Sequence, residues 1–314
     1  MAKAMNNPEA PPMRELRVQL ARHAEPKQAH LPLRSIMLTA TNAPTPPFAQ
    51  VAEPDRMHEP AFALVAQGAK RVVLGDQVFD YAAGQYLIFS VDLPLSGRVV
   101  QASENEPFLG FGLKLKPDVI AALLLETGAR PKAKIEPPAI AVSDLTDDLV
   151  DPVVRLLRLL DRPEDIPVLA PAIEREILWR LINGEQGAMV RQLGLADSRM
   201  TQIGRAIRWL RDHYAETVRI EDLADIAGMS LTSFHRHFLN VTSLSPLQFQ
   251  KQIRLQEARS QLLSSSEDVA TVGFAVGYDS PSQFSREYRR LFGAPPGQDM
   301  QRLRRSKDVS DAAY

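Results

Sequence analysis

The chain of 314 residues contains no cysteine. This absence excludes disulfide bonds, thiolate zinc sites, a cysteine nucleophile and any thiol-based sensor of oxidants or electrophiles. The sequence also lacks an apolar run long enough to cross a membrane. Its first twelve residues do not combine a basic segment with an apolar stretch, as a secretory signal would. We therefore expect a cytoplasmic protein without a membrane partner.

The chain also lacks a large excess of positive or negative charge. Lysine and arginine number 37 against 38 aspartates and glutamates, so the formal net charge is −1. From residue 197 to the end there are 16 basic and 14 acidic residues, a net charge of +2, and the rest of the chain has 21 and 24, a net charge of −3. A nucleic-acid-binding protein needs a basic face rather than a basic chain, so this asymmetry favours DNA binding only weakly.

Residues 61–115 contain short apolar runs with alternating polar side chains, which is the pattern of β-strands. Turn-forming residues separate the runs, as at Gly75-Asp76 and at Ala82-Ala83-Gly84. Several short strands with glycine turns at regular spacing predict a small antiparallel sandwich or barrel. We expect strands at residues 62–66, 71–74, 77–81, 86–89, 98–101 and 108–113.

Helical patterns surround this β segment. Residues 1–13 are polar and proline-rich and predict a disordered tail, followed by a short helix near residues 15–23. A short amphipathic helix is expected at residues 119–126 and longer ones at residues 146–160 and 171–183, and the chain is helical from residue 197 to about 304. The leucine-rich face of residues 149–160 has two interpretations: it covers the β segment, or it forms a dimer interface together with residues 173–181. The fold class predicted is α+β.

One pattern occurs twice between residues 220 and 296, at an offset of about fifty residues. Each copy reads as a short helix, a glycine turn and a second helix, which is the helix-turn-helix arrangement. A chain with two copies in tandem can place two helices in successive segments of the DNA major groove. The first copy contains Gly228, Phe234, Arg236, Phe238 and Pro246, and the second contains Gly277, Phe284, Arg286, Tyr288 and Pro296.

The second helix of each copy carries the candidate DNA contacts. In each, two aromatic residues four positions apart face inward, and polar side chains that can read base edges and phosphates face outward. Ser230 and Ser280 are expected to cap these helices, and the helix over residues 246–263 is expected to separate them by roughly 34 Å, one helical turn of DNA. The outward residues are Thr232, Ser233, His235, Arg236 and Asn240 in the first helix and Ser282, Gln283, Ser285, Arg286, Arg289 and Arg290 in the second.

An all-α interaction domain with solvated polar faces is the alternative interpretation. Two copies in matching register, with Arg236 and Arg286 at equivalent positions, argue against it. Residues 198–305 moreover resemble the DNA-binding domain of the AraC/XylS family of transcription regulators. The resemblance is carried by the runs Ala227-Gly-Met-Ser, Ser233-Phe-His-Arg-His-Phe, Ser245-Pro-Leu-Gln-Phe, Arg254-Leu-Gln-Glu-Ala-Arg, Val276-Gly-Tyr-Asp-Ser and Gln283-Phe-Ser-Arg-Glu-Tyr.

This resemblance implies a seven-helix domain with two recognition helices on one face of DNA. It assigns base or phosphate contacts to Thr232, His235 and Arg236 in the first helix, and to Ser282, Gln283 and Arg286 in the second. Pro281 departs from the polar residue common at its position, which puts a base contact there in doubt.

The segment before this domain resembles an N-terminal domain found on some members of the family. The resemblance is carried by Ala66-Gln-Gly-Ala-Lys, Gly84-Gln-Tyr-Leu and Ser90-Val-Asp-Leu-Pro. It implies a cupin-like antiparallel β-barrel followed by helices, acting as an effector-binding and dimer-forming module. We thus expect a tail at residues 1–13, an effector-binding or dimerisation domain at residues 14–190 and a DNA-binding domain at residues 198–306.

Histidine is too scarce in the barrel segment for the metal site that many cupins hold. The segment contains only His58, and none of the other five histidines is placed to complete a cluster. We therefore expect no metal, no cofactor and no catalysis. Candidate polar anchors for a ligand are Arg56, His58, Tyr81, Tyr86 and Asp92, although each also reads as an ordinary strand or surface residue.

The function predicted is that of a sequence-specific transcription regulator. Its partners would be double-stranded DNA, RNA polymerase, a small-molecule effector bound in the N-terminal barrel and a second copy of the chain. One alternative is a DNA-binding regulator whose N-terminal domain only dimerises. Another is a barrel enzyme with accessory DNA binding, which a cluster of metal-binding or acid–base residues within residues 50–115 would favour.

Overall fold

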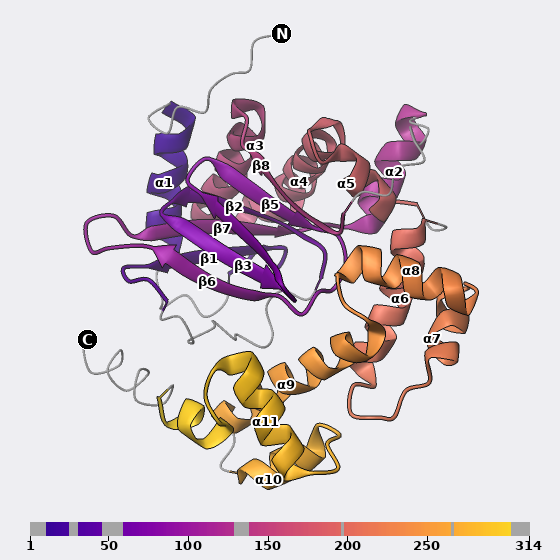
Figure 1. Cartoon of the computed structure of the whole chain (residues 1–314). Helices are drawn as coiled ribbons and strands as arrows, with labels where there is room; N and C mark the ends of the chain where they lie inside the picture. Colours follow the sequence, from indigo (N-terminus) through magenta and orange to yellow (C-terminus); the bar gives the residue numbers. More distant parts are fainter. Residues whose placement is uncertain are drawn as a thin grey trace. The chain divides into compact units, whose positions relative to one another are not determined.

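The computed structural model describes residues 11–24, 31–45, 59–128, 138–195, 198–264 and 267–302. The chain forms two compact units, here called the N-terminal and C-terminal units. The N-terminal unit contains most of the chain up to Thr201, and the C-terminal unit contains the residues from Gln202 onward. The α+β fold class predicted from the sequence is confirmed, with antiparallel sheets in the N-terminal unit and helices in the C-terminal unit (Figure 1).

Two antiparallel sheets form the centre of the N-terminal unit. Five strands lie in the order β1-β7-β2-β5-β8, and three lie in the order β4-β3-β6. The pairs β1·β7, β2·β7, β2·β5, β5·β8 and β3·β4 are all antiparallel. The strands are β1 (Ile36–Thr41), β2 (Ala61–Gln67), β3 (Ala69–Leu74), β4 (Gln77–Ala82), β5 (Gln85–Phe89), β6 (Ser96–Gln101), β7 (Phe108–Lys114) and β8 (Ile140–Asp144).

The six strands expected from the sequence are present, and the structure adds β1 and β8. These two are the outer strands of the five-stranded sheet. Each buries only one or two of its residues, whereas β2, in the interior of the sheet, buries six in succession. Outer strands with so little buried surface lack the hydrophobic run or the clean alternation on which a prediction depends.

In the described residues of the N-terminal unit, the sheets are accompanied by two short 3-10 helices, Leu159–Asp161 and Pro163–Asp165, and by five α-helices. The α-helices are α1 (Pro11–His23), α2 (Pro117–Thr127), α3 (Asp147–Arg158), α4 (Ile166–Asn183) and α5 (Gly187–Leu193). Figure 1 shows α1, α3 and α4 along one side of the strands, and α3 contacts both α1 and α4. Leu149, Val153, Leu156 and Leu157 of α3 are buried there. The leucine-rich face therefore belongs to the core of the unit, and a dimer would have to use another surface.

The helix α1 corrects the predicted extent of the N-terminal tail. It begins at Pro11, so residues 11–13 are helical, while residues 1–10 lie outside the described residues. Prolines in a first helical turn are tolerated because the amide hydrogens there have no partner within the helix. Met13, Leu16 and Leu20 follow at helical spacing and are all buried, so packing of this stripe extends the helix into the proline-rich segment.

In its described residues the C-terminal unit has a helical segment at residues 296–302 in addition to six labelled helices. The labelled helices are α6 (Arg199–Asp212), α7 (Ile220–Ala227), α8 (Leu231–Thr242), α9 (Pro246–Ser264), α10 (Val269–Ala275) and α11 (Pro281–Phe292). The helices α7 and α8 form the first helix-turn-helix, and α10 and α11 form the second. The helix α9 connects them and, at 19 residues, is about 28 Å long at the usual rise of 1.5 Å per residue.

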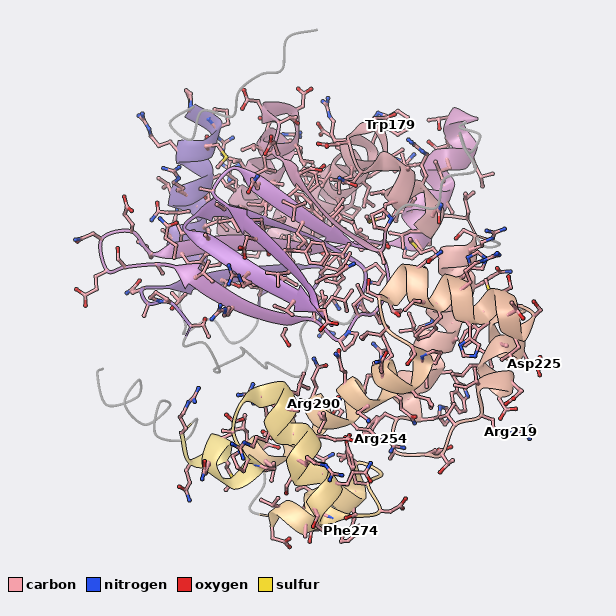
Figure 2. The ribbon with its side chains drawn as sticks, viewed as in Figure 1. Trp179, Arg219, Asp225, Arg254, Phe274 and Arg290 are labelled. Carbon is pink, nitrogen blue, oxygen red and sulfur yellow. The ribbon has the colours of Figure 1, made fainter. Side chains whose placement is uncertain are left out.

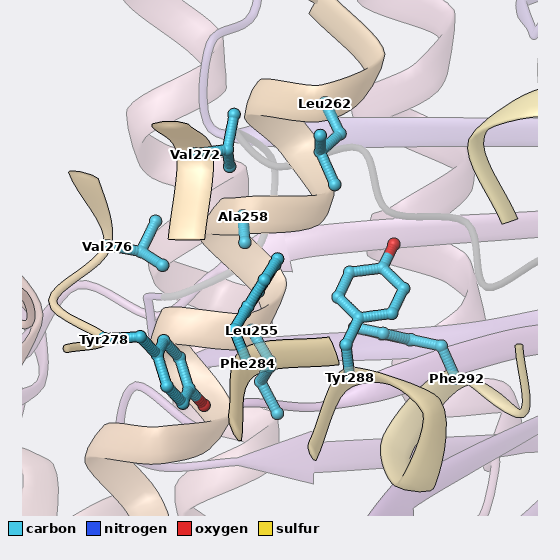
Figure 3. Close-up of a cluster of buried hydrophobic side chains, with 9 residues drawn as sticks. All are labelled: Leu255, Ala258, Leu262, Val272, Val276, Tyr278, Phe284, Tyr288 and Phe292. Carbon is cyan, nitrogen blue, oxygen red and sulfur yellow. The ribbon is translucent and has the colours of Figure 1, made fainter. Parts of the chain in front are cut away.

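Each helix-turn-helix has its own aromatic core against α9. In the first, the ring of Phe238 lies 5.3 Å from that of Phe234 and 5.4 Å from that of Phe249 on α9. The second core is shown in Figure 3 and has nine buried side chains: Leu255, Ala258, Leu262, Val272, Val276, Tyr278, Phe284, Tyr288 and Phe292. The burial of Phe234, Phe238, Phe284 and Tyr288 expected from their spacing is confirmed.

Candidate nucleic-acid interface

The first recognition helix, α8, follows a turn made by Gly228. This glycine has a φ of +68° and ends α7 in the left-handed conformation, where an L side chain would be strained. Ser230 occupies the N-cap position of α8 as expected, but its side chain makes no capping hydrogen bond. Phe234 and Phe238 fix the inward face of the helix, which determines the residues left on its outer face.

Most of the predicted contact residues of α8 lie on that outer face. Thr232, His235, Arg236 and Asn240 are exposed, and Ser233 is half-buried. His237, which the sequence did not single out, is buried with 2% of its surface exposed. Its Nε2 lies 3.3 Å from Nη2 of Arg236. The buried imidazole thus contacts the guanidinium of Arg236.

The second helix-turn-helix is capped more completely than the first. Asp268 begins α10, and its Oδ1 accepts hydrogen bonds from the amides of Ala270 at 2.8 Å and Thr271 at 3.0 Å. The hydrogen bond from the Thr271 hydroxyl, together with these amides, lowers the pKa of the Asp268 carboxyl. Ser280 caps α11 by accepting from the amide of Gln283 at 3.4 Å, and Pro281 follows in the first turn, as predicted.

The outer face of α11 is basic and polar. Ser282, Gln283, Arg286, Arg289 and Arg290 are exposed, and Ser285 is half-buried. Figure 2 labels Arg290 on this helix and Phe274 on α10. Three arginines within one turn and a half concentrate positive charge on this surface, which suits a polyanion.

Gln283 is held by a carboxylate that sequence reasoning missed. Its amide donates to Oε1 of Glu287 at 3.3 Å, and Glu287 also accepts from Lys251 Nζ at 2.9 Å and from the hydroxyl of Tyr278 at 3.0 Å. Burial opposes ionisation of Glu287, but the hydrogen bonds from Lys251, Tyr278 and Gln283 outweigh it and lower the pKa of its carboxyl. A side chain expected to read bases is therefore linked through Glu287 to the connecting helix α9.

A buried ion pair lies under α11. The guanidinium of Arg259 donates to Asp299 from Nε at 2.8 Å and from Nη2 at 3.2 Å, and the two residues are 1% and 0% exposed. The hydroxyl of Tyr288 donates to the same carboxylate at 2.9 Å. Arg259 also lies over the ring of Phe292, with its Cζ 4.6 Å from the ring centroid. This cluster joins α9, which carries Arg259, to α11, which carries Tyr288, through the carboxylate of Asp299.

A cavity of about 380 Å³ occurs in the N-terminal unit, where the ends of β5 and β8 meet the start of α3 and the end of α4. Tyr86 and Trp179 supply aromatic surface to it, and Asp144, Asp148, Glu185 and Arg180 supply charge. Its remaining lining residues are Thr146, Leu149, Leu181, Asn183 and Gly184. Figure 2 labels Trp179.

Of the candidate effector residues that the structure describes, one lines this cavity and two do not. Tyr86 belongs to the lining, and burial raises the pKa of its hydroxyl. Tyr81 and Asp92 are buried elsewhere in the unit, and burial raises the pKa of Tyr81 as well. Arg56 and His58 lie outside the described residues. Trp179 and the carboxylates of the lining come from segments far apart in the sequence, so no local pattern indicated them.

Within the described ranges, no three histidine, aspartate or glutamate side chains group as they would around a metal ion. In the same part of the chain, no helix has both the length and the apolar character needed to cross a membrane.

A β-rich unit followed by two helix-turn-helix motifs on one connecting helix defines a class of DNA-binding regulator, and the comparisons with known proteins place the chain within it. The pattern of the AraC-type transcriptional regulator N-terminus matches residues 32–189, and that of a helix-turn-helix domain matches residues 223–302. The chain belongs to the AraC family of transcriptional regulators.

Relatives with curated functions resemble part of the chain. The HTH-type transcriptional activator RhaS of Escherichia fergusonii is 30% identical over 158 residues, which are 49% of this chain and 54% of RhaS. RhaS of Citrobacter koseri is 32% identical over 134 residues, 42% of this chain and 46% of RhaS. The chain thus spans about half the length of the curated relatives it matches.

Solved structures of ToxT from Vibrio cholerae resemble most of the fold. ToxT of strain SCE256 with a bound unsaturated fatty acid has a TM-score of 0.53 at 9% identity, over 85% of this chain and 95% of ToxT. ToxT of strain O395 has a TM-score of 0.51 at 8% identity, over 85% of this chain and 98% of ToxT. At such identities the resemblance concerns the fold.

Proposed function

We propose that this protein is a transcription regulator that binds double-stranded DNA in a sequence-specific manner by placing α8 and α11 in the major groove. The observation that carries the proposal is the pair of exposed polar helix faces, each fixed by an aromatic core on the same connecting helix. The proposed contact residues are Thr232, Ser233, His235, Arg236 and Asn240 on α8, and Ser282, Gln283, Arg286 and Arg290 on α11.

Arg236→Ala and Arg286→Ala are each expected to weaken binding to the preferred DNA site by about 5- to 150-fold, since one bidentate arginine–guanine contact contributes about 1–3 kcal/mol of discrimination. The site would first be selected from random duplexes with the full-length protein, and affinities would then be measured by titration. Affinity should also fall steeply with salt, because phosphate contacts release counterions.

The control for these variants is Arg208→Ala, which removes an exposed arginine of α6, outside both recognition helices. An equal loss for Arg208→Ala would mean that total positive charge, rather than base reading, sets the affinity. Unchanged affinity of the Arg236 or Arg286 variant would remove that residue from the contact set.

We infer further that the cavity lined by Tyr86 and Trp179 receives a small-molecule effector with a cationic group. The lining contributes three carboxylates and one guanidinium, and aromatic faces attract cations through their quadrupole. ToxT has been solved with an unsaturated fatty acid. The acidic lining of the present cavity disfavours the carboxylate of such a ligand, so we propose a different ligand class for this chain.

Cationic metabolites, in particular amines and quaternary ammonium compounds, are expected to raise the melting temperature of the full-length protein, because a ligand of the native state stabilises it by mass action, by about 2.7 kcal/mol at one hundred times its Kd. Trp179→Ala should abolish the shift. Leu125→Ala, which shortens an exposed apolar side chain of α2 outside the cavity lining, is the control.

A shift caused by fatty acids that survives Trp179→Ala would contradict the proposed ligand class and its location. If no compound of either charge shifts the melting temperature, the N-terminal unit serves dimerisation alone, which is the second candidate function. Exposed apolar side chains at Val168 and Leu169 of α4 offer a surface for a second copy. Sedimentation of the full-length protein would detect that homodimer.

We propose that the protein acts as a regulator rather than as an enzyme, in the cytoplasm, with RNA polymerase as a partner at its target promoters. Membership of a family of transcriptional regulators supports this proposal. A family effector can regulate only by binding one arrangement of the chain better than another. DNA affinity measured with and without the cationic ligand would therefore reveal the coupling as a change in Kd.

A further inference from the structure

The connecting helix α9 is shared by two hydrophobic cores. Phe249 in its first half packs on Phe238 of the first helix-turn-helix. Leu255, Ala258 and Leu262 in its second half belong to the core of the second. A shared helix sets the distance between the two motifs, but each motif could still tilt on it, because apolar packing is not directional. Directional polar contacts between the two halves would add to this packing in fixing the relative orientation of α8 and α11.

Arg254 lies on α9 where the helix passes from the first core to the second (Figure 2). Its Nε donates to the carbonyl of Tyr214 at 2.6 Å, and its Nη2 donates to the carbonyls of Glu216 at 2.9 Å and Ala215 at 3.3 Å. Its Nη1 donates to the carbonyl of Gly277 at 2.7 Å. Residues 214–216 lead into α7 of the first motif, and Gly277 forms the turn of the second.

The loop that leads into the first motif also touches the turn of the second at this point. A Cβ placed on Gly277 would lie 2.3 Å from the carbonyl oxygen of Ala215, so only a glycine permits the approach. Gln250, one turn before Arg254, adds hydrogen bonds to the carbonyls of Tyr214 at 3.0 Å and Glu216 at 2.8 Å. Partial burial lowers the pKa of the Arg254 guanidinium, which remains charged because an arginine is not deprotonated in proteins.

The side chain of Tyr214 packs against the core of the second motif at this junction, and Arg254 adds polar contacts beside it. A cavity of about 270 Å³ opens beside this arginine, lined by Gln250, Lys251, Arg254, Gly277, Tyr278 and Gln283 among others. The polar part of the junction is a planar guanidinium whose donors diverge toward the loop at residues 214–216 and toward the turn at Gly277. A lysine has its three donors on a single nitrogen and cannot span the same carbonyls.

We propose that Arg254 is a positioning residue that locks the two helix-turn-helix motifs in one relative orientation, so that α8 and α11 accept only one spacing between their two DNA half-sites. The proposal rests on the DNA-binding function proposed above. Arg254 need not touch DNA for this role. It acts through the loop at residues 214–216 and through the turn at Gly277.

The test measures tolerance to half-site spacing with the full-length protein. Duplexes would carry the selected site with one base pair inserted or deleted between its halves, which rotates one half by about 34–36° relative to the other. We expect the wild type to lose at least about tenfold in affinity on either change, whereas Arg254→Gln binds the native spacing more weakly and discriminates among the three spacings by less than about threefold.

Arg205→Gln is the matched control. Arg205 is an exposed arginine that, like Arg254, donates to a backbone carbonyl, that of Ala227 at 3.3 Å, but this bond joins α6 to the end of α7 without reaching the second motif. The control should therefore keep the spacing discrimination of the wild type. If Arg254→Gln lowers the melting temperature of the chain, Arg254→Lys becomes the deciding variant, since it retains the charge but not the divergent donors.

Three outcomes would overturn the proposal. Wild-type spacing discrimination in Arg254→Gln, or in Arg254→Lys where that variant decides, would show that α9 and the apolar cores orient the motifs without Arg254. A relaxed spacing in Arg205→Gln would show that any loss of an arginine loosens the domain. Failure of the wild type to select any duplex would refute the DNA-binding function itself, and the positioning role would fall with it, so the two failures are distinguishable.

Discussion

Replacing Asp299 by alanine is expected to lower the free energy of unfolding of the C-terminal unit by about 3–5 kcal/mol, the usual cost of removing one partner of a buried ion pair. The carboxylate of Asp299 is fully buried and accepts hydrogen bonds from Arg259 and Tyr288. Its loss would leave the guanidinium of Arg259 charged and buried without its counter-ion. DNA binding through α11 should fall in parallel.

The measurement suited to this prediction is native-state hydrogen exchange of the amides of α10 and α11. A chain of two compact units need not unfold in a single step, so one melting temperature would not isolate the effect. Asp80→Ala is the matched control, because Asp80 also binds an arginine through two oxygens, at 2.6 and 2.7 Å, but the pair is exposed. Exposed pairs contribute little to stability.

A further variant separates the ion pair from the space it fills. Combined replacement of Arg259 by methionine, Asp299 by leucine and Tyr288 by phenylalanine removes the charges and the hydroxyl together. Such apolar substitutions of similar volume are often neutral or stabilising. The amides of α10 and α11 should therefore stay protected from hydrogen exchange in this variant, whereas they lose protection in Asp299→Ala. If Asp299→Ala exchanges like the wild type, or if Asp80→Ala is equally destabilised, the buried pair is not what holds α11 in place.

Gly277→Ala is expected to destabilise the C-terminal unit by about 2–5 kcal/mol. The φ of Gly277 is +90°, which an L side chain adopts only at a cost of about 1–2 kcal/mol. The new methyl group would also lie 2.3 Å from the carbonyl oxygen of Ala215, and such overpacking costs about 1–3 kcal/mol more. The turn of the second motif would have to move away from the first.

Gly228→Ala is a natural comparison, because Gly228 makes the same turn in the first motif. Its φ is +68°, but the nearest atom to an added Cβ is Nη2 of Arg205 at 3.8 Å, so the methyl group has room. We expect only the backbone cost of about 1–2 kcal/mol. Exchange measurements on both variants would show whether the difference is real. Equal destabilisation would mean that the contact with Ala215 carries no energy.

The two helix-turn-helix motifs could be predicted from the sequence because their signals are local. Glycine turns, pairs of aromatic residues four positions apart and serine caps all lie within a few residues of the helices they define. The outward face of α8 and α11 follows directly once the buried aromatics are known. The contacts of these faces with DNA stay a prediction.

The supporting contacts could not be predicted, since they join residues far apart in the chain. Arg259 and Asp299 are forty positions apart, and each is of a type usually found on the surface. Arg254 belongs to a run typical of the family, but its partners are backbone carbonyls, which no side-chain pattern indicates. Glu287 and Lys251 likewise meet only when α9 and α11 have packed together.

The N-terminal unit divides in the same way. An interior strand such as β2 is buried almost throughout, so its sequence is a continuous apolar run that predicts a strand. The outer strands β1 and β8 and the short helix α5 have weak local patterns. The cavity is assembled from two strands and two helices, so its aromatic and acidic lining becomes visible only in three dimensions. Of the candidate ligand anchors, Tyr86 lies in that lining and Tyr81 does not.

The double use of α9 makes its length a mechanical constraint on the whole domain. Each residue of an α-helix advances the chain by about 1.5 Å and turns it by about 100°. One residue inserted between Phe249 and Leu255 would therefore rotate one aromatic core away from the other and carry the guanidinium of Arg254 out of reach of one set of carbonyls. An insertion or deletion within this helix would therefore disturb both helix-turn-helix motifs at once.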